Sequence, residues 1–140
     1  MTPQQVSLIQ SSWAQVVPIR EQAATLFYDT LFTMDPALRP LFKGDMSEQG
    51  RKLMGVLGVV VASLERLQEL VPTVQALGAK HVGYGVRNAH YDTVGQALLQ
   101  TLELGLGPAF TEPVRDAWAT AYATLAGVMQ EAAAASPQAA

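Results

Sequence analysis

The chain has 140 residues, of which 49% are hydrophobic and only 15% are charged, with a formal net charge of −3 and no cysteine. This length predicts a single domain, and the lack of cysteine excludes disulfides, thiolate metal sites and cysteine nucleophiles. Because the sequence has no basic run, no N-terminal signal pattern and no apolar stretch of about 18 residues, we expect a cytoplasmic protein with no nucleic-acid or membrane partner.

Helix signals dominate the first half of the chain, and convincing strand patterns are missing. Thr2, with Pro3 and Gln5 behind it, forms a capping-box pattern that begins a first helix. The Asp-Pro pair at 35–36 begins a short helix, and residues 42–45 form a break. The predicted helices of this half cover residues 2–17, 21–34, a short segment after 35, 47–66, and a segment that continues through 78.

The second half continues the helical pattern. A Gly-Tyr-Gly break at 83–85 precedes a helix over about 89–104, and a last helix covers about 111–132. The tail at 136–140 is low in complexity and is expected to fray. The sequence therefore predicts an all-α fold of about seven or eight helices, with one domain over residues 1–135.

Three polar side chains, Tyr28, Gln49 and His81, continue or flank apolar helix faces. Each has an ordinary structural explanation: a core tyrosine bonded to a carbonyl, a glutamine in a solvated first turn, and a hydrogen-bonded core histidine. The apolar stripe that follows Gln49 consists of Leu53, Val56, Leu57, Val60 and Leu64.

The two histidines, His81 and His90, cannot readily share a metal ion. Nine residues at 3.6 per turn would place them on opposite sides even of one continuous helix. With no cysteine and no third histidine, a zinc or non-haem iron site lacks ligands. Three inward polar groups in so apolar a chain favour one large, mostly apolar cofactor with a single nitrogen ligand, and haem meets that description.

Six segments resemble the globins, in the order in which that family has them. They are LIQSSWAQV (8–16), LFYDTLFTMDPALRPLF (26–42), EQGRKLM (48–54), LGAKHVGYGV (77–86), HYDTVGQALLQTL (90–102) and AWATAYATLAGVM (117–129). The chain is similar to single-domain bacterial globins and to the haem domain of flavohaemoglobins, and more loosely to neuroglobin. The resemblance implies the globin fold, a three-over-three helical sandwich around haem b.

The resemblance also implies a role for each matching position. His81 is then the proximal iron ligand, Tyr28 and Gln49 act on the bound gas, Phe42 stacks on haem, and Leu53 forms the apolar wall over the iron. The other implied haem contacts are Lys52, Leu57, Lys80, Tyr84, Val86, Tyr91 and Val94. The candidates to meet the haem propionates, with a solvated surface role as the alternative, are Lys52, Lys80 and Arg87. His90 matches a histidine outside the ligand site.

One position departs from the flavohaemoglobin pattern. Those proteins carry a glutamate in the last helix that joins the proximal histidine and tyrosine, and the matching residue here is Ala133. Glu131, two residues earlier, points about 200° away around a helix. The sequence also contains no flavin or nicotinamide domain, so a catalytic cycle is expected to need a separate reductase.

The resemblance implies tight, reversible O2 binding at a five-coordinate iron, with NO and CO as further small ligands. Nitric-oxide detoxification with a separate reductase is the catalytic interpretation. The alternatives are a non-enzymatic oxygen store, scavenger or carrier, and an oxygen sensor. Either Tyr28 or water is the sixth ligand expected for ferric iron.

Overall fold

The computed structural model describes residues 1–42, 44–83 and 88–135, and these residues are almost entirely helical, with no strand among them. Their six α-helices are α1 (Pro3–Val16), α2 (Arg20–Met34), α3 (Met46–Ala62), α4 (Leu67–Gly83), α5 (Asn88–Leu106) and α6 (Glu112–Ala135). Four short 3₁₀ segments accompany them: η1 (Val17–Ile19), η2 (Pro36–Leu41), η3 (Leu64–Arg66) and η4 (Gly107–Ala109). The predicted all-α fold is confirmed, but the expected seven or eight helices are six α-helices and these shorter turns.

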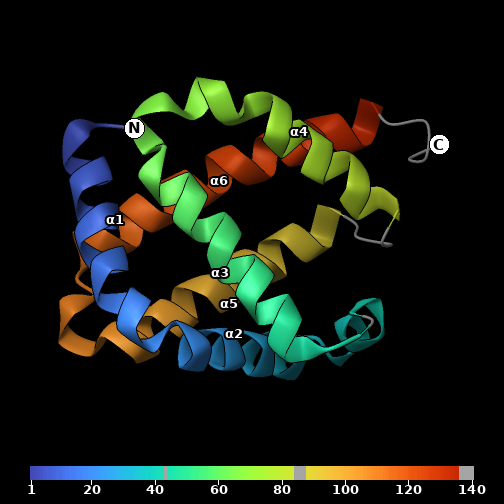
Figure 1. Cartoon of the computed structure of the whole chain (residues 1–140), viewed down its shortest axis with the longest axis horizontal. Coiled ribbons are helices and arrows are strands. Elements are labelled where there is room, and N and C mark those ends of the chain that lie inside the picture. Colours follow the sequence, from blue (N-terminus) through green and yellow to red (C-terminus); the bar gives the residue numbers. More distant parts are fainter. Residues whose placement is uncertain (43, 84–87, 136–140) are drawn as a thin grey trace.

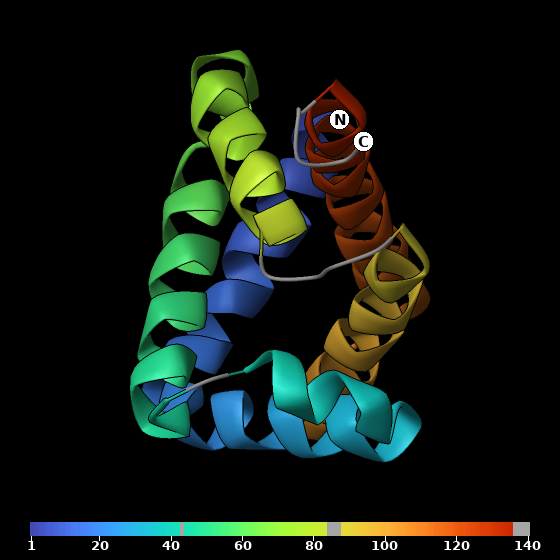
Figure 2. The same cartoon turned by 90° about the vertical axis from the view of Figure 1, so that its right-hand side faces the viewer.

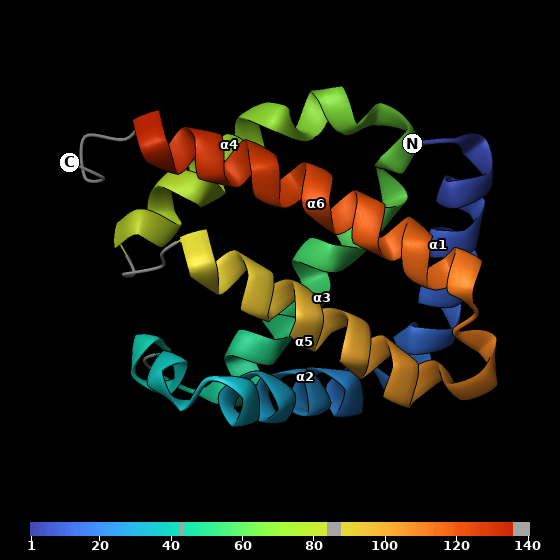
Figure 3. The same ribbon diagram turned by 180° about the vertical axis from the view of Figure 1, so that it is seen from behind.

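The helices lie in two layers. Figure 1 shows α3 and α4 toward the viewer, and Figure 3 shows α5 and α6 on the opposite side. Seen from the side in Figure 2, α3 and α5 lie on opposite sides, α4 and α6 approach each other at the top, and α2 runs across the bottom. The most extensive contacts join α4 to α6 and α2 to α5. The first of these connects the two layers, and the second connects α2 to the layer that contains α5.

The first helix begins as its sequence predicts. The Thr2 backbone N–H donates to Gln5 Oε1 (3.0 Å), and the Gln5 N–H donates to Thr2 Oγ1 (3.1 Å), which is the predicted capping box. α1 packs against α6 around a buried polar contact in which Trp118 Nε1 donates to Ser12 Oγ (2.8 Å). This bond satisfies an indole N–H that would otherwise be buried without a partner.

The helix α3 differs from its prediction at both ends. Asp45 caps it, because the Asp45 carboxylate accepts from the backbone N–H two residues further on (2.9 Å). The helix ends at Ala62 and does not reach residue 66, since Ser63 leaves the helical conformation (φ −109°, ψ 12°) and the next three residues form a 3₁₀ turn. The chain therefore turns earlier than the apolar pattern indicates.

The helix α4 is longer than the sequence signals require. The segment predicted through residue 78 continues to Gly83, so His81 lies inside the last turn of this helix. The helix α5 extends its predicted range by one residue at its start and two at its end, whereas α6 begins one residue later and ends three residues later than predicted. Within the described residues, no helix combines the length and the hydropathy that a membrane-spanning segment requires.

Candidate functional site

Tyr28 projects from α2 into a cluster of aromatic rings. Its side chain is only 7% exposed, and its ring lies 5.0 Å from that of Phe27, 5.9 Å from Phe32 and 5.4 Å from Phe42, between ring centroids. The edge-to-face and offset geometries are those that aromatic pairs prefer. The expected inward position of Tyr28 is therefore what the structure has.

Gln49, in the first turns of α3, is half-buried and its side chain hydrogen-bonds the Tyr28 hydroxyl. The two helices come close at the neighbouring position, where a Cβ added to Gly50 would lie 3.0 Å from the Cβ of Ala24. Ala24 is one turn before Tyr28 on α2. The small residues at this crossing thus bring Tyr28 and Gln49, hereafter the distal pair, within hydrogen-bonding reach.

Burial raises the pKa of Tyr28 to about 12, and the hydrogen bond from Gln49 offsets part of that rise. Because the effect of Gln49 is to lower this pKa, the Gln49 side chain favours the phenolate form of Tyr28. The tyrosine remains protonated at neutral pH.

The apolar face of α3 is rotated relative to the predicted stripe. Leu53 and Leu57 are half-buried, but Val56 is 43% exposed, so its predicted place in the inner stripe is wrong. The buried line runs instead through Gly50 and Met54. At 100° per residue, Val56 lies about 160° around the helix from Met54, which carries it to the outer side.

His81 is half-buried on α4, and its Nδ1 lies 2.5 Å from the carbonyl oxygen of Leu77. A carbonyl can only accept, so Nδ1 donates its proton there and the lone pair of the neutral ring is on Nε2. Metal-binding histidines are commonly oriented in this way by a carbonyl partner, which fixes the tautomer. The ring therefore has the form that an iron ligand requires.

Tyr91, at the start of α5, is 7% exposed, and its hydroxyl has no hydrogen-bond partner among the described residues. Burial raises the pKa of this tyrosine. An unsatisfied buried hydroxyl costs about 1–3 kcal/mol, so such atoms point to an unseen polar partner. Its backbone carbonyl accepts from the Tyr122 hydroxyl of α6 (2.6 Å). Val94, one turn further along α5, is half-buried against the core.

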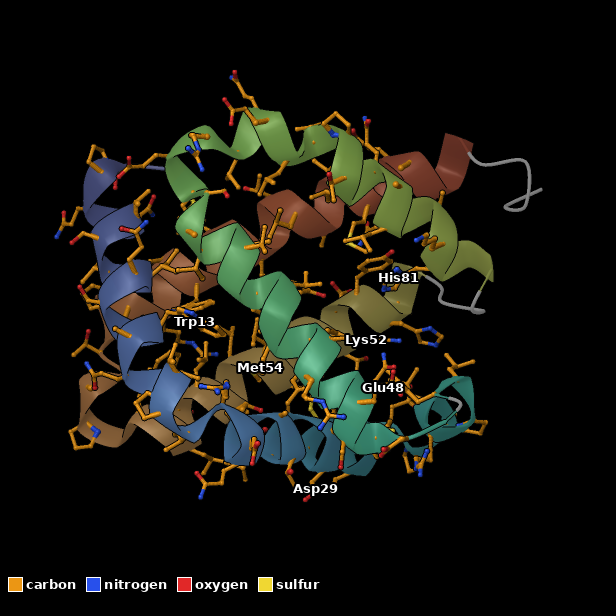
Figure 4. The ribbon with its side chains drawn as sticks, viewed as in Figure 1. Trp13, Asp29, Glu48, Lys52, Met54 and His81 are labelled. Carbon is orange, nitrogen blue, oxygen red and sulfur yellow. The ribbon has the colours of Figure 1, made fainter. Side chains whose placement is uncertain are left out.

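The remaining predicted residues are arranged less tightly. Lys52 and Lys80 are exposed, and Figure 4 shows Lys52 on α3 and His81 on α4 at the same end of the molecule. His90 is half-buried in the first turn of α5. Glu131 is exposed, as expected for a residue directed away from the site. The predicted contacts Tyr84, Val86 and Arg87 and the side chain of Ala133 lie outside the described part of the chain.

Sequence reasoning missed three features that position the site: the Gly50–Ala24 crossing, the Leu77 carbonyl, and the Tyr122 bond to Tyr91. The carbonyl is the one feature that the sequence could have indicated, since the residue four before a helical histidine always lies beneath it.

The donor set and its surroundings fit haem better than a bare metal ion. No group of three potential metal ligands occurs among the residues that the structure describes. One oriented imidazole, half-buried apolar side chains and a buried orphan hydroxyl match a large apolar group with a single nitrogen ligand. A surface hollow of about 660 Å³ lies elsewhere, and none of the predicted site residues line it; its walls are Met34, Gln96, Gln100, Glu103, Leu104 and Arg115.

Residues 25–129 match the family model described as Globin. A flavohemoprotein of Bordetella parapertussis is 33% identical over 133 residues, which cover 92% of this chain and 33% of that protein. A flavohemoprotein of Vibrio cholerae is 30% identical over 135 residues, which cover 91% of this chain and 33% of that protein. The chain thus spans about a third of the length of these curated relatives.

Two solved structures have a similar backbone. A bacterial globin from Campylobacter jejuni has a TM-score of 0.82 and 26% identity, over 94% of this chain and 96% of that one. An engineered carbene transferase, named a candidate nitric oxide dioxygenase from Rhodothermus marinus, has a TM-score of 0.86 and 25% identity, over 96% and 94%. Both likenesses extend over nearly the whole of each chain.

Proposed function

The chain belongs to the globin family and has the globin fold, and on that premise we propose that it is an oxygen-binding haem protein with His81 as its iron ligand. Haem b, when bound, would supply an iron that takes one nitrogen ligand from the protein and binds diatomic gases reversibly. The observation that carries the proposal is the distal pair: a buried tyrosine whose side chain interacts with that of Gln49 on the neighbouring helix.

Residues on both sides of the proposed site would hold and orient the group. His81 presents Nε2 because its Nδ1–H donates to the Leu77 carbonyl. Phe42 and Leu53 are half-buried and packed against the core, which suits contact with a flat apolar ring. The other proposed haem contacts are Leu57, Tyr84, Val86, Tyr91 and Val94, with Lys52, Lys80 and Arg87 as partners of the propionates. The proposed haem domain comprises residues 1–135.

The distal pair sets the expected affinity for oxygen. The Tyr28 O–H would donate to a gas ligand that carries partial negative charge, and a hydrogen bond to a charged group contributes roughly 1.5–3 kcal/mol. Each 1.4 kcal/mol is tenfold in an equilibrium constant, and the gain falls mostly on the dissociation rate. We therefore expect tight binding with slow release of O2 in a site that also takes NO and CO.

The catalytic extension of this proposal is nitric-oxide detoxification: NO, O2 and one electron give nitrate. We propose a separate reductase as the source of that electron. Support comes from the names of the flavohemoproteins and of the Rhodothermus marinus protein. The alternative is a non-enzymatic store, scavenger, carrier or sensor. Ala133, in place of the glutamate, favours this alternative.

The proposal is tested by the O2 dissociation rate of the ferrous protein, measured by stopped-flow mixing with CO. Tyr28→Phe should release O2 at least tenfold faster than the parent, and Gln49→Leu should have a smaller effect in the same direction. Thr101→Val is the matched control, because it removes a buried hydroxyl that donates to the Ala97 carbonyl and belongs to none of the proposed site residues. His81→Ala should lose the histidine-ligated haem spectrum.

If the parent protein releases O2 fast and Tyr28→Phe does not change the rate, Tyr28 is a packing residue. The protein is then better described as an ordinary oxygen carrier. Nitrate formation from NO in the presence of a cellular reductase then separates the enzyme from the store. Turnover that depends on Tyr28 supports the dioxygenase, and its absence supports the non-enzymatic alternative.

A further inference from the structure

The helices α4 and α6 touch backbone to backbone at Gly78. A Cβ added to this glycine would lie 2.4 Å from the Met129 carbonyl oxygen, 2.8 Å from its Cα and 2.9 Å from its carbonyl carbon. All three distances are shorter than real Cβ atoms show. Any side chain at this position therefore requires α4 and α6 to move apart.

At the other glycines with close neighbours, the nearest atoms belong to side chains. A Cβ at Gly95 would lie 2.7 Å from the ring of Tyr122, and one at Gly50 would lie 3.0 Å from the Cβ of Ala24. Among the glycines whose surroundings the structure describes, only Gly78 has backbone atoms as its nearest obstacles. The Tyr122 ring can rotate away, whereas a carbonyl within a helix moves only with the helix. The Cβ of Ala24 also moves only with its helix, but its 3.0 Å approach is less severe than those at Gly78.

A displacement of Gly78 reaches His81 through the peptide bond between Leu77 and Gly78. The Leu77 carbonyl that accepts the proton of His81 Nδ1 (2.5 Å) and the nitrogen and Cα of Gly78 belong to one planar peptide unit. Displacing Gly78 therefore displaces the acceptor that orients the imidazole. His81 itself lies three residues further along the same helix, about 4.5 Å along its axis.

We propose that Gly78 is a positioning residue for His81: its missing side chain lets α4 lie against the α6 backbone and fixes where the imidazole nitrogen lies. This inference rests on the proposed function, in which His81 binds the haem iron. To reach an ordinary contact of about 3.4 Å, a Cβ now at 2.4 Å must move by roughly 1 Å. Metal–ligand distances are held to roughly 0.2 Å, so relaxation of this size strains or reorients the ligand.

The test is the iron–histidine stretching band of the ferrous, unliganded protein, recorded by resonance Raman spectroscopy. Gly78→Ala should shift or broaden the band and speed haem transfer to excess apomyoglobin at least tenfold. Gly105→Ala, whose new methyl group would meet only the Ile19 side chain at 3.5 Å, should leave the band in place. Met129→Ala should also leave the band in place, because the contact uses only the backbone of Met129.

A second pair of variants shows whether the effect passes through His81. In His81→Gly supplied with imidazole, the iron ligand is not tethered to α4. Adding Gly78→Ala to that variant should leave its iron–imidazole band unchanged. A shift of equal size there would mean that Gly78 acts on the whole pocket and would overturn the inference.

Failure of this inference is distinguishable from failure of the proposed function. A parent protein without an iron–histidine band refutes the proposed function. A parent with that band, and a Gly78→Ala band identical to it, refutes the positioning role alone. If Gly78→Ala does not fold, it is examined with Gly55→Ala and Gly127→Ala, two substitutions into open space that are expected to stabilise their helices.

Discussion

The buried hydroxyl of Tyr28 should make the protein less stable at alkaline pH. In the unfolded chain this tyrosine loses its proton near pH 10, whereas in the folded protein burial raises the pKa to about 12. Between these values the folded state holds a proton that the unfolded state has lost. The free energy of unfolding therefore falls as the pH rises above 10.

The size of the effect follows from the shift. Two pKa units correspond to roughly 3 kcal/mol when the pH is well above both values. At pH 11 the unfolded tyrosine is mostly ionised and the folded one is not, so the contribution of Tyr28 is about 1.4 kcal/mol. Burial also raises the pKa of Tyr122, which adds a loss of the same sign.

Urea unfolding, followed by far-ultraviolet circular dichroism at pH 8 and pH 11, measures this loss. Tyr28→Phe should lower stability at pH 8 by removing the hydrogen bond, but it should lose about 1.4 kcal/mol less than the parent on going to pH 11. Comparing parent and variant cancels the titration of exposed lysines. Equal losses in the two proteins would refute the reasoning, because Tyr28 would then ionise as easily in the folded state as in the unfolded one.

Three further predictions concern single substitutions within the helices. Ser12→Ala strands the buried Trp118 N–H and should cost roughly 2 kcal/mol, a fall of roughly 6 °C in the melting temperature; the same cost in a Trp118→Phe background would contradict the hydrogen-bond explanation. Gly50→Ala should push α3 from α2 and loosen the distal pair, speeding O2 release about fivefold for a loss of roughly 1 kcal/mol. Ala24→Gly in the same chain should restore the parent rate, and no restoration would show that the crossing does not set the pair. Gly55→Ala, in an exposed helical position with nothing within 4 Å, should raise the free energy of unfolding by about 1 kcal/mol in urea titrations, and an unchanged midpoint would argue against that estimate.

The sequence predicts those parts of the fold that local rules control. The capping residues Thr2 and Gln5 specify the start of α1 through contacts three residues apart, and the structure has those contacts. The inward position of Tyr28 follows from the spacing of its apolar neighbours. The prediction that Val56 lies on the inner face of α3 is wrong, because several apolar residues on this helix fit more than one apolar stripe.

Contacts between distant segments are not predictable in this way. The approach of Gly50 to Ala24 joins residues 26 positions apart, and the sequence around either residue does not predict this contact. The early end of α3 at Ala62 is similar, since the apolar pattern continues past the residue at which the backbone turns. Local patterns therefore indicate which residues point inward, whereas tertiary packing decides which of them meet.

The side chains at positions 24 and 50 compete for the same small space between α2 and α3, and this competition has a consequence for directed evolution. Two Cβ atoms at these positions would be only 3.0 Å apart, so a methyl group gained at one calls for one lost at the other. Libraries that randomise only Tyr28 and Gln49 would explore chemistry at fixed spacing. Libraries that vary Ala24 and Gly50 as a couple would tune that spacing, and with it the proposed retention of gas, while Tyr28 and Gln49 are kept.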